Sequence, residues 1–216
     1  MEFRNQNTIF NPENQISNIH IVGCGSTGSF IALNLAKMGI ESIKVTDFDK
    51  VEEHNIPNQF YREEDIGFSK VDALQDIIVR FTGTSIEIEE KKIDEDYQFD
   101  LNLDTIIIVC VDNIETRKLI YKKIKEFPVI LIDTRLGGEG YQIYSIGLTN
   151  QADKDFYEKV LDKPTKDAPC GQKAIIFCIL SLAAEVCRII KCIDKKEDYP
   201  KILKREMEQY RFIKDL

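Results

Sequence analysis

The sequence lacks the cysteine patterns that stabilise small secreted domains or hold structural zinc. Its six cysteines lie at positions 24, 110, 170, 178, 187 and 192, and none of them forms a Cys-x-x-Cys motif. Structural zinc sites commonly use two such motifs, and disulfide frameworks place many cysteines in a short secreted chain. A signal-peptide pattern is also missing at the start of the sequence. These absences predict a cytoplasmic protein without structural zinc.

Long apolar runs and an excess of basic residues are missing too. Residues 175–190 are apolar, but Glu185 and Arg188 interrupt a stretch that is already short for a membrane span. We therefore expect a buried or dimer-facing helix there and no membrane association. The 29 Lys and Arg residues are outnumbered by 37 Asp and Glu residues, so the net charge of -8 argues against a nucleic-acid-binding surface.

A glycine-rich segment is the most informative feature that is present. Gly23, Gly25 and Gly28 follow the apolar run at 18–22 and precede residues 29–39, whose apolar spacing predicts a helix. Such a strand-to-helix turn offers backbone amides and the positive end of a helix to a phosphate. The next expected strand, 41–47, ends in Asp47 at the same sheet edge, where an acidic residue binds ribose hydroxyls.

The residues that follow the glycines carry a resemblance to a known family. Asp47-Phe48-Asp49-Lys50-Val51 is followed by Asn55, by Asn58-Gln59, by Gly67 with Lys70, and by Cys110-Val111-Asp112-Asn113 with Arg117. This ordered series resembles the ubiquitin-activating-like adenylyltransferases, the ThiF/MoeB/HesA superfamily. That family reads Asp-x-Asp-x-Val, Asn-x-x-Arg-Gln and Gly-x-x-Lys at these spacings. The resemblance covers roughly residues 4–148 and is far more specific than the glycines alone.

The resemblance implies a role for each matching residue. Lys70 contacts phosphate, and Asp112 assists Mg²⁺ and the reacting phosphate, which suits a hard oxygen ligand. Asp47 binds the ribose, and Asp49 lies deeper in the site near the metal and phosphates. Two further amide side chains border the triphosphate: Asn55 and Gln59. Each residue also has a purely structural reading, such as a solvated lysine or a helix cap, although Asn113 is better placed than Asp112 to cap the following helix.

Two further residues resemble functional residues of the family. Arg4, in Arg4-Asn5-Gln6, resembles the arginine that family members insert into the partner subunit's active site; a solvated tail residue is the alternative. Cys170 precedes the apolar segment, a place that resembles the family's reactive cysteine, and a helix N-terminus lowers a thiol pKa and favours thiolate attack. A small residue packed at a helix start explains Cys170 equally well.

The sequence departs from the family pattern at one position. The arginine expected before Gln59 is Asn58, so a guanidinium that contacts phosphate is missing. Arg62 and Arg135 are candidates to supply the missing positive charge. Arg135 is included among the expected nucleotide-binding residues. This departure leaves a non-catalytic docking subunit open as an alternative. A NAD-dependent oxidoreductase also fits the three glycines with Asp47, but gives no reason for Asn55, Gln59, Lys70 and Asp112.

The alternation of apolar segments predicts one Rossmann-like α/β domain with a mostly parallel sheet flanked by helices, additional C-terminal strands and a long apolar helix. We expect an N-terminal arm at 1–18, a nucleotide-binding core at 19–148, a crossover excursion at 149–169 and a helical part at 170–216. Within the last part, residues 195–216 are expected to form an amphipathic helix or arm. Further strands are expected at 85–89, 105–111, 129–133 and 141–146, and further helices at 70–81 and 115–127.

The resemblance also implies an activity and partners. The expected reaction uses ATP and Mg²⁺ to adenylate the C-terminal carboxylate of a small ubiquitin-like or sulfur-carrier protein, or of a peptide, and releases pyrophosphate. A later thioester or sulfur transfer at Cys170 is a further step that the resemblance allows. A homodimer is expected, because Arg4 is useful only if it reaches a neighbouring subunit.

Overall fold

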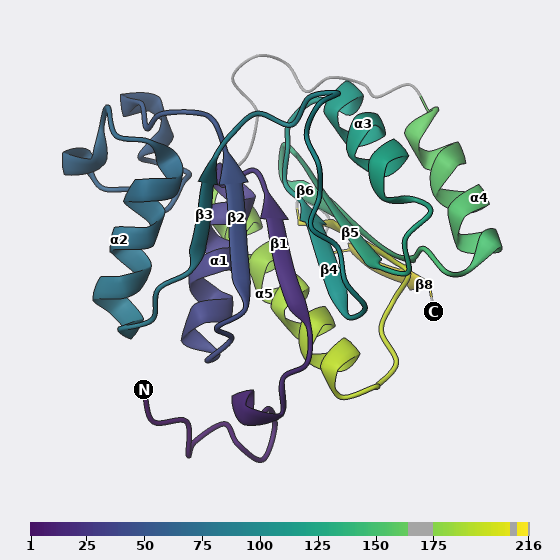
Figure 1. Ribbon diagram of the computed structural model, residues 1–216, viewed down its shortest axis with the longest axis horizontal. Helices are drawn as coiled ribbons and strands as arrows, with labels where there is room; N and C mark the ends of the chain where they lie inside the picture. The colour runs from purple at the N-terminus through teal and green to yellow at the C-terminus, as the bar shows by residue number, and fades with distance from the viewer. Residues whose placement is uncertain (164–174, 208–210, 216) are drawn as a thin grey trace.

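An eight-stranded sheet forms the centre of the molecule (Figure 1). The computed structural model describes residues 1–163 and 175–207, together with the backbone of 211–215. The strands follow the order β3-β2-β1-β4-β5-β6-β7-β8 across the sheet. Their bounds are Asn18–Val22 (β1), Ile43–Asp47 (β2), Glu87–Glu90 (β3), Thr105–Val109 (β4), Ile130–Gly137 (β5), Gly140–Gly147 (β6), Ile202–Glu206 (β7) and Arg211–Asp215 (β8).

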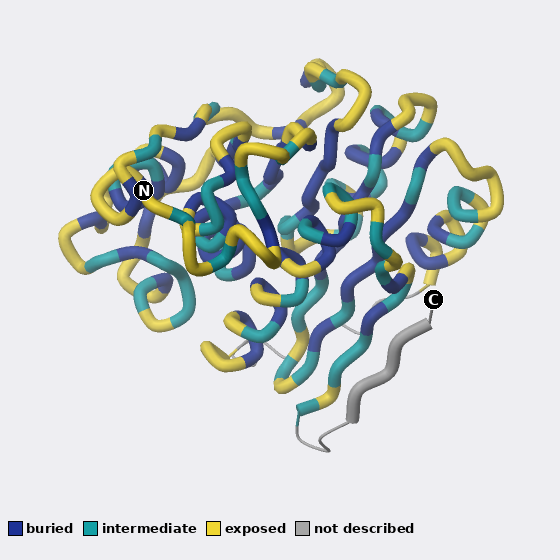
Figure 2. The backbone as a smooth tube through the Cα atoms, turned by 90° about the horizontal axis from the view of Figure 1, so that it is seen from below, coloured by how far each residue is buried: buried dark blue, intermediate teal, exposed yellow. Residues whose placement is uncertain are grey.

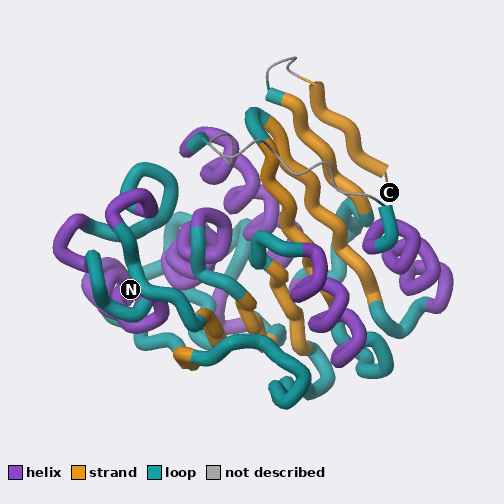
Figure 3. The backbone as a smooth tube through the Cα atoms, turned by 90° about the horizontal axis from the view of Figure 1, so that it is seen from above, coloured by secondary structure: helices purple, strands orange, loops and turns teal. Residues whose placement is uncertain are grey.

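Helices cover both faces of this sheet (Figure 3). The α-helices are Ser26–Lys37 (α1), Lys70–Thr82 (α2), Ile114–Ile124 (α3), Gln151–Leu161 (α4) and Ile176–Asp194 (α5). Short 3-10 helices span Pro12–Asn14 (η1), Glu53–Asn55 (η2) and Glu63–Asp65 (η3). Among the described residues, no helix combines the length and the apolar character needed to cross a membrane.

The strand order reverses between β1 and β4. Strands β3, β2, β1, β4 and β5 are parallel, whereas β6, β7 and β8 extend the sheet in antiparallel fashion. The register aligns Val22 of β1 with Val109 of β4, so the loops that follow both strands start at the same level. Open α/β sheets bind ligands outside the carboxyl ends of the strands at such a reversal point. The fold therefore directs attention to the segments that begin at Gly23 and Cys110.

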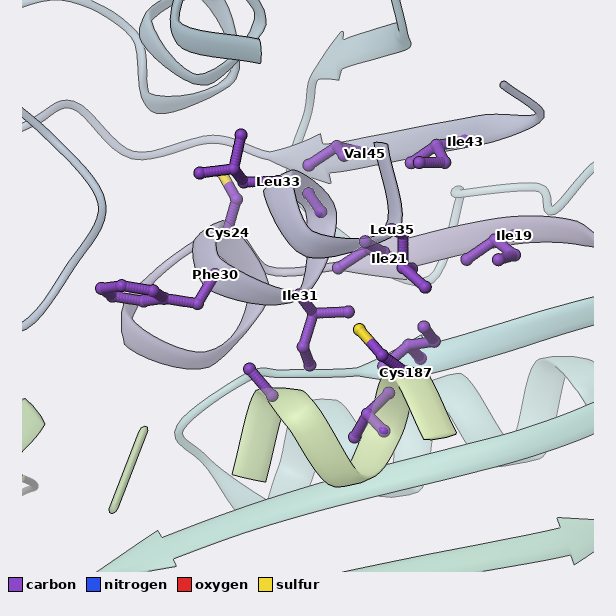
Figure 4. Close-up of a cluster of buried hydrophobic side chains, with 14 of the residues drawn as sticks. Ile19, Ile21, Cys24, Phe30, Ile31, Leu33, Leu35, Ile43, Val45 and Cys187 are labelled. Carbon is purple, nitrogen blue, oxygen red and sulfur yellow. The ribbon is translucent and has the colours of Figure 1, made fainter. Parts of the chain in front are cut away.

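Two apolar cores lie on the two faces of the sheet. Successive residues of β4 alternate between them: Ile106 and Ile108 belong to the core beneath α1, α2 and α5, and Ile107 and Val109 belong to the core beneath α3 and α4. A strand that is buried on both faces needs apolar residues at every position, which explains the unbroken run in β4. Figure 4 shows part of the first core, and Figure 2 shows the buried strands between more exposed loops.

The mostly parallel sheet flanked by helices is the arrangement that the sequence predicted. The structure of the C-terminal segment differs from the prediction. Residues 195–216 were expected to be a helix or arm, and the helical expectation is wrong because β7 and β8 form there. Leu203 is fully buried and pairs with Ile143 of β6, whereas its neighbour Lys204 is partly exposed. Residues 202–206 form a strand because they pair with the free edge of β6. Strand formation depends strongly on such tertiary context.

Element boundaries differ in smaller ways. Helix α1 begins at Ser26, three residues before the expected start, because the glycine turn closes sooner than the apolar spacing indicates. Residues 149–169 were expected to form a crossover excursion, and residues 164–169 lie outside the described part of the chain. Helix α4 forms there, and the side chain of Asn150 caps it by accepting hydrogen bonds from the amides of Ala152 and Asp153 at 2.9 and 3.4 Å.

A polar network is buried beneath β1 and β2. His20 Nε2 lies 2.8 Å from Thr46 Oγ1, and the Thr46 hydroxyl donates to Glu89 at 3.2 Å. Tyr97 also donates to Glu89, at 2.7 Å. Burial, reinforced by the positive charge of Lys44, lowers the pKa of His20 to about 4 from an ordinary value of 6.5. The folded protein therefore holds His20 neutral at pH values where the unfolded chain protonates it.

This difference predicts a loss of stability in mild acid. Below pH 6.5 the unfolded chain binds a proton at His20, whereas the folded chain binds it only near pH 4. The free energy of unfolding should therefore fall between pH 6.5 and about pH 4, by up to about 3 kcal/mol. Urea unfolding of wild type and His20→Gln at several pH values measures the effect. The free energy of unfolding of His20→Gln should depend less on pH than that of wild type. The control His54→Gln, which alters an exposed histidine, should show the wild-type pH dependence. Parallel curves for wild type and His20→Gln would contradict the prediction.

Candidate nucleotide-binding site

The glycine turn after β1 is packed too closely for any side chain at two of its positions. Gly23 has a φ of +90°, and a Cβ there would lie 3.0 Å from the carbonyl oxygen of Cys110. A Cβ on Gly28 would overlap the carbonyl oxygen of Gly23. These glycines let the turn lie against the end of β4 while the first turn of α1 lies against β1. The N-terminus of α1, with its free amides, is thereby fixed at the reversal point of the sheet.

The segment after η2 (Glu53–Asn55) packs on this turn. The Tyr61 hydroxyl donates to the Cys24 carbonyl at 2.7 Å, and the Phe60 amide donates to Ser29 Oγ at 3.0 Å. A Cβ on Gly25 would lie 3.9 Å from Gln59 Nε2, so the Gln59 side chain borders the glycine turn. The Gln59 Oε1 and Asn58 Oδ1 atoms are buried and have no hydrogen-bond partner in the described part of the chain. Buried polar atoms without partners are rare, so Asn58 and Gln59 retain hydrogen-bonding capacity beside the glycine turn.

Asp47 organises the glycine turn from the end of β2. The carboxylate is buried, its Oδ2 accepts a hydrogen bond from the Cys24 amide at 2.7 Å, and its Oδ1 accepts one from the Asp49 amide at 2.9 Å. The sequence predicted Asp47 at this edge but not its contact with the glycine turn. Asn55 also has a structural contact, because its Oδ1 accepts a hydrogen bond from the Glu52 amide at 2.9 Å.

Lys70 starts α2 and directs its ammonium group toward the two aspartates after β2. Its Nζ donates to Asp49 Oδ2 at 2.9 Å, and its amide donates to the Asp49 carbonyl, also at 2.9 Å. Only 7% of Lys70 is exposed. Burial alone would lower the pKa of Lys70, but the hydrogen bond with Asp49 and the charge of Asp47 raise it overall. Lys70 is therefore a buried, charged lysine rather than a solvated one.

Asp112 lies where β4 ends, across the reversal point from the glycine turn. Its side chain is exposed, and the structure gives it no hydrogen bond among the described residues. The expectation that Asn113 caps the following helix is confirmed, because Asn113 Oδ1 accepts a hydrogen bond from the Thr116 amide at 2.8 Å. Asp112 is thus a free carboxylate at the sheet edge, a donor of the kind that Mg²⁺ prefers.

A metal ion at this edge would depend on ligands beyond the chain itself. No group of three or more His, Cys, Asp and Glu side chains within metal-binding reach occurs in the described part of the chain. Mg²⁺ is commonly held by one or two carboxylates together with substrate phosphates and water, rather than by a protein cage. The single free carboxylate of Asp112 fits that mode of binding.

A buried ionic network lies one strand further, where β5 follows β4. Asp133 is completely buried and accepts hydrogen bonds from Arg117 Nη1, from Arg135 Nε at 2.8 Å and from the Tyr157 hydroxyl at 3.0 Å. Arg117 also donates to the Val111 carbonyl, and burial lowers the pKa of Arg117 to about 10. The network thus connects Arg135 to the turn that carries Asp112.

Sequence reasoning missed the part that Asp133 plays in this network. The signal was present, because a carboxylate inside an otherwise apolar strand must be paired when it is buried. Arg117 and Arg135 were both noted, but their common partner was not identified. Residues 117, 133 and 157 come from different elements, and only the packing of α3 and α4 on β5 brings them together.

Three other residues of interest lie elsewhere or are occupied. Arg62 forms ion pairs with Glu64, Asp65 and Asp76 at 2.7, 2.7 and 2.8 Å, and these contacts raise its pKa. It therefore does not replace the arginine missing at Asn58. Arg4 is exposed and pairs with Glu2 at 3.3 Å. Its neighbour Phe3 packs against Gly39, just after α1 ends, and the N-terminus lies beyond the end of the sheet where β1 begins (Figure 1). Cys170 lies outside the described residues.

The sheet order and its flanking helices define an α/β protein of the doubly wound type. The chain belongs to the ThiF family, whose family model matches residues 13–213.

Relatives and solved structures give a consistent picture. The ubiquitin-like modifier-activating enzyme 5 of Caenorhabditis elegans is 31% identical over 112 residues, which cover 46% of this chain and 27% of that protein. The NEDD8-activating enzyme E1 catalytic subunit of Dictyostelium discoideum is 34% identical over 105 residues, or 46% of this chain and 23% of that protein. The chain thus spans about a quarter of the length of these curated relatives.

The fold itself is similar to that of solved structures over almost the whole chain. E. coli MccB with ATP superposes with a TM-score of 0.75 at 17% identity, covering 94% of this chain and 65% of that one. PaaA superposes with a TM-score of 0.70 at 20% identity and the same coverage.

Proposed function

We propose that the protein is an ATP-dependent adenylyltransferase that activates the C-terminal carboxylate of a small ubiquitin-like or sulfur-carrier protein, or of a peptide. One observation carries the proposal: the glycine turn, Asp47, Lys70 and Asp112 all lie at the carboxyl edge of three adjacent strands, around the point where the strand order reverses. The names of the relatives, which activate a ubiquitin-like modifier and NEDD8, support this class of acyl substrate.

The proposed reaction is a displacement at the α-phosphorus of ATP. An oxygen of the substrate carboxylate attacks that phosphorus, the bond from it to the oxygen that bridges to the β-phosphate breaks, and pyrophosphate leaves. The product is an acyl adenylate. Such a reaction needs accurate positioning of the two reactants and stabilisation of the negative charge that develops on the phosphate oxygens.

The chain supplies groups for both tasks. The amides at the start of α1 are the proposed donors to phosphate oxygens, and the charged ammonium of Lys70 is the proposed cation beside them. Asp47 is the proposed partner of the ribose hydroxyls, since each of its oxygens can accept a second hydrogen bond. The Gln59 side chain borders the glycine turn, where the phosphates would lie. Asn55 is the second proposed amide beside the triphosphate, although its Oδ1 already accepts a hydrogen bond from the Glu52 amide.

The proposed cofactor beside ATP is Mg²⁺, with Asp112 as its protein ligand and Asp49 close to the phosphates. Bound Mg²⁺ would neutralise phosphate charge and polarise a phosphoryl oxygen. Asp49 is paired with Lys70 through its Oδ2, so Lys70 has to exchange this contact for a phosphate oxygen when a nucleotide enters. The ion pair keeps Lys70 charged and oriented until then.

Binding and exchange measurements test the proposal. Calorimetry should show binding of ATP and of its analogue AMPCPP, and no comparable binding of NAD. Radiolabelled pyrophosphate should enter ATP once a carrier protein with a free C-terminus is added, with a candidate from a neighbouring gene as the first choice. Binding of NAD in preference to ATP would show that the oxidoreductase alternative is correct.

A non-catalytic docking subunit is the second candidate function. The observation in its favour is Asn58, which stands where the family has an arginine, while Arg62 is held by three carboxylates and does not compensate. A docking subunit would bind a related protomer without exchanging pyrophosphate. Nucleotide binding without exchange, for every carrier protein tested, would favour this candidate.

We propose a homodimer as the working assembly. Exposed apolar side chains at the start of α5 support an interface there, with Ile176, Phe177 and Leu180 between 38% and 47% exposed. Arg4 extends from the opposite end of its own sheet, so it can complete a site only in a neighbouring copy. Sedimentation at tens of micromolar should give a dimer, and Arg4→Ala should lower activity. A monomer with full activity in Arg4→Ala would remove both ideas.

A later transfer to Cys170 remains a prediction that the described residues do not address. If Cys170 accepts the acyl group, a conjugate with the carrier protein that is cleaved by thiols should form and should disappear in Cys170→Ala, whereas pyrophosphate exchange should survive. If Cys170 takes no part, Cys170→Ala should keep both exchange and product formation.

A further inference from the structure

One nitrogen of the Arg135 guanidinium makes no hydrogen bond with the described residues. Its Nε donates to Asp133, and its guanidinium carbon lies 5.1 Å from the centre of the Tyr144 ring, so the side chain is held along its length. Its Nη2 atom is nevertheless buried without a hydrogen-bond partner. A buried donor of this kind is normally satisfied, and leaving it unpaired costs free energy. The Arg135 side chain as a whole is 17% exposed, so an oxyanion from outside the protein can reach the guanidinium and satisfy this donor after a small shift of the side chain.

The charges around Arg135 indicate a single negative charge as that partner. Arg117 and Arg135 are both cationic, and among the described residues Asp133 is the one carboxylate that accepts hydrogen bonds from them. One positive charge of this buried network is therefore not neutralised by a direct contact. A carboxylate carries one negative charge and matches the planar geometry of a guanidinium, whereas a triphosphate carries several charges.

The position of Arg135 in the sheet separates it from the proposed phosphate-binding groups. The register pairs Asp133 of β5 with Val109 of β4, which places Arg135 level with Val111, one strand beyond Asp112 and its turn. Asp47 lies on β2, three strands away from β5. With neighbouring strands about 4.8 Å apart, that separation is roughly 14 Å. Arg135 and Lys70 thus lie on opposite sides of the reversal point.

The distance between Arg135 and Lys70 fits the geometry of the proposed reaction. In a displacement at phosphorus, the attacking and leaving oxygens lie roughly in line on opposite sides of the phosphorus atom. If the leaving pyrophosphate is held by the glycine turn and Lys70, the attacking carboxylate approaches from the side of β4 and β5. Arg117 and Arg135 are the two described cations of the Asp133 network on that side, and Arg135 is the one with an unpaired donor. Its hydrogen bond to Asp133 holds it there.

We propose that Arg135, positioned by Asp133, binds the C-terminal carboxylate of the acyl substrate and directs it toward the α-phosphate. The inference rests on the proposed adenylation, and it replaces the expectation that Arg135 binds the nucleotide. Asp133 acts through Arg135 and is therefore a positioning residue. The Asp133 carboxylate also accepts a hydrogen bond from Arg117, which donates to the Val111 carbonyl next to Asp112. Asp133 therefore positions both Arg135 and the turn that carries Asp112.

The test compares two probes that differ only in charge: the tripeptide Ala-Gly-Gly with a free C-terminal carboxylate, and its C-terminal amide. Calorimetry on the full chain, with and without AMPCPP, measures both. Wild type should bind the carboxylate form at least about 10-fold more tightly than the amide, as expected for a charge-assisted hydrogen bond. Arg135→Gln should bind both forms within about 2-fold of each other and keep its affinity for AMPCPP.

The variant is expected to fold, because Asp133 keeps its contacts with Arg117 and Tyr157 and the remaining pair is balanced in charge. Arg80→Gln removes an exposed arginine that pairs with Asp76 on α2, and this control should keep the wild-type preference. Arg135→Lys keeps the charge but loses the planar fork, and it should recover only part of the preference.

Two results would overturn the inference. Equal affinity of wild type for the carboxylate and the amide would show that no carboxylate site exists. A large loss of AMPCPP affinity in Arg135→Gln would show that Arg135 binds the nucleotide instead. Failure of the proposed function is distinguishable from both, because wild type would then not bind AMPCPP, while the peptide measurements without nucleotide would still report on Arg135.

Discussion

Replacing Lys70 by alanine is expected to reduce pyrophosphate exchange into ATP by at least about 100-fold, and replacing Asp112 by alanine should have an effect of similar size. Lys70 is the buried cation beside the glycine turn, and its pKa is raised, so its charge is present throughout the neutral range. Asp112 is the free carboxylate on the other side of the reversal point. Both interactions would strengthen as negative charge develops on the phosphate, so their loss should appear mainly in the rate.

Neither change should unfold the protein. Lys70 gives up one ion pair with Asp49, whose side chain is 48% exposed, and Asp112 gives up no hydrogen bond among the described residues. Thermal unfolding should therefore remain close to that of wild type. Lys118→Ala and Glu115→Ala remove a surface cation and a surface carboxylate from α3, and they serve as matched controls that should keep full exchange. Exchange within a few fold of wild type in both Lys70→Ala and Asp112→Ala would refute the assignment.

The parts of the site that the sequence predicted are the parts that depend on local chain geometry. Asp47 is the last residue of an apolar strand, and the three glycines and Asp112 follow the ends of two others within a few residues. Strand periodicity alone therefore places them at one edge of a parallel sheet. Lys70 was located by its spacing from Gly67 within a family pattern. Its burial beside Asp49 was not predictable, because it depends on how the chain between residues 50 and 69 folds back over the sheet edge.

The parts that the sequence did not predict depend on contacts between distant segments. The Asp133 network requires the register of β5 against β4 and the packing of two helices over them, and no local pattern specifies either. The same limit explains the C-terminal segment. Residues 202–206 read as charged and helical in isolation, but the open edge of β6 offers them a complete set of backbone partners. Tertiary context overrides weak local preference in such cases.

Replacing Gly28 by alanine is expected to destabilise the fold and to abolish nucleotide binding. Helix propensity alone would predict the opposite sign, because alanine is favoured over glycine inside a helix by up to about 1 kcal/mol. Gly28 lies in the first turn of α1, however, and a Cβ there would overlap the carbonyl oxygen of Gly23, with the Ile21 side chain 3.2 Å away. An overlap with backbone cannot be relieved by a change of rotamer, so the steric effect should dominate.

The cost of such overpacking is typically about 1–3 kcal/mol, and a backbone contact places Gly28→Ala at the upper end of that range. In a chain of 216 residues this corresponds to a fall in Tm of roughly 6–12 °C. Nucleotide binding should be lost as well, because relief of the overlap must move the turn of Gly23 or the start of α1, the two features that present amides to the phosphates.

Gly137→Ala is the matched control for this change. Gly137 ends β5 and has no positive φ, and a Cβ on it would meet no atom within 4 Å beyond its chain neighbours. Its replacement should therefore change stability by no more than about 0.5 kcal/mol. Calorimetric unfolding and AMPCPP titration of both variants measure the contrast. If Gly28→Ala were as stable as Gly137→Ala and bound AMPCPP like wild type, the close approach of α1 to the glycine turn would not be what builds the site.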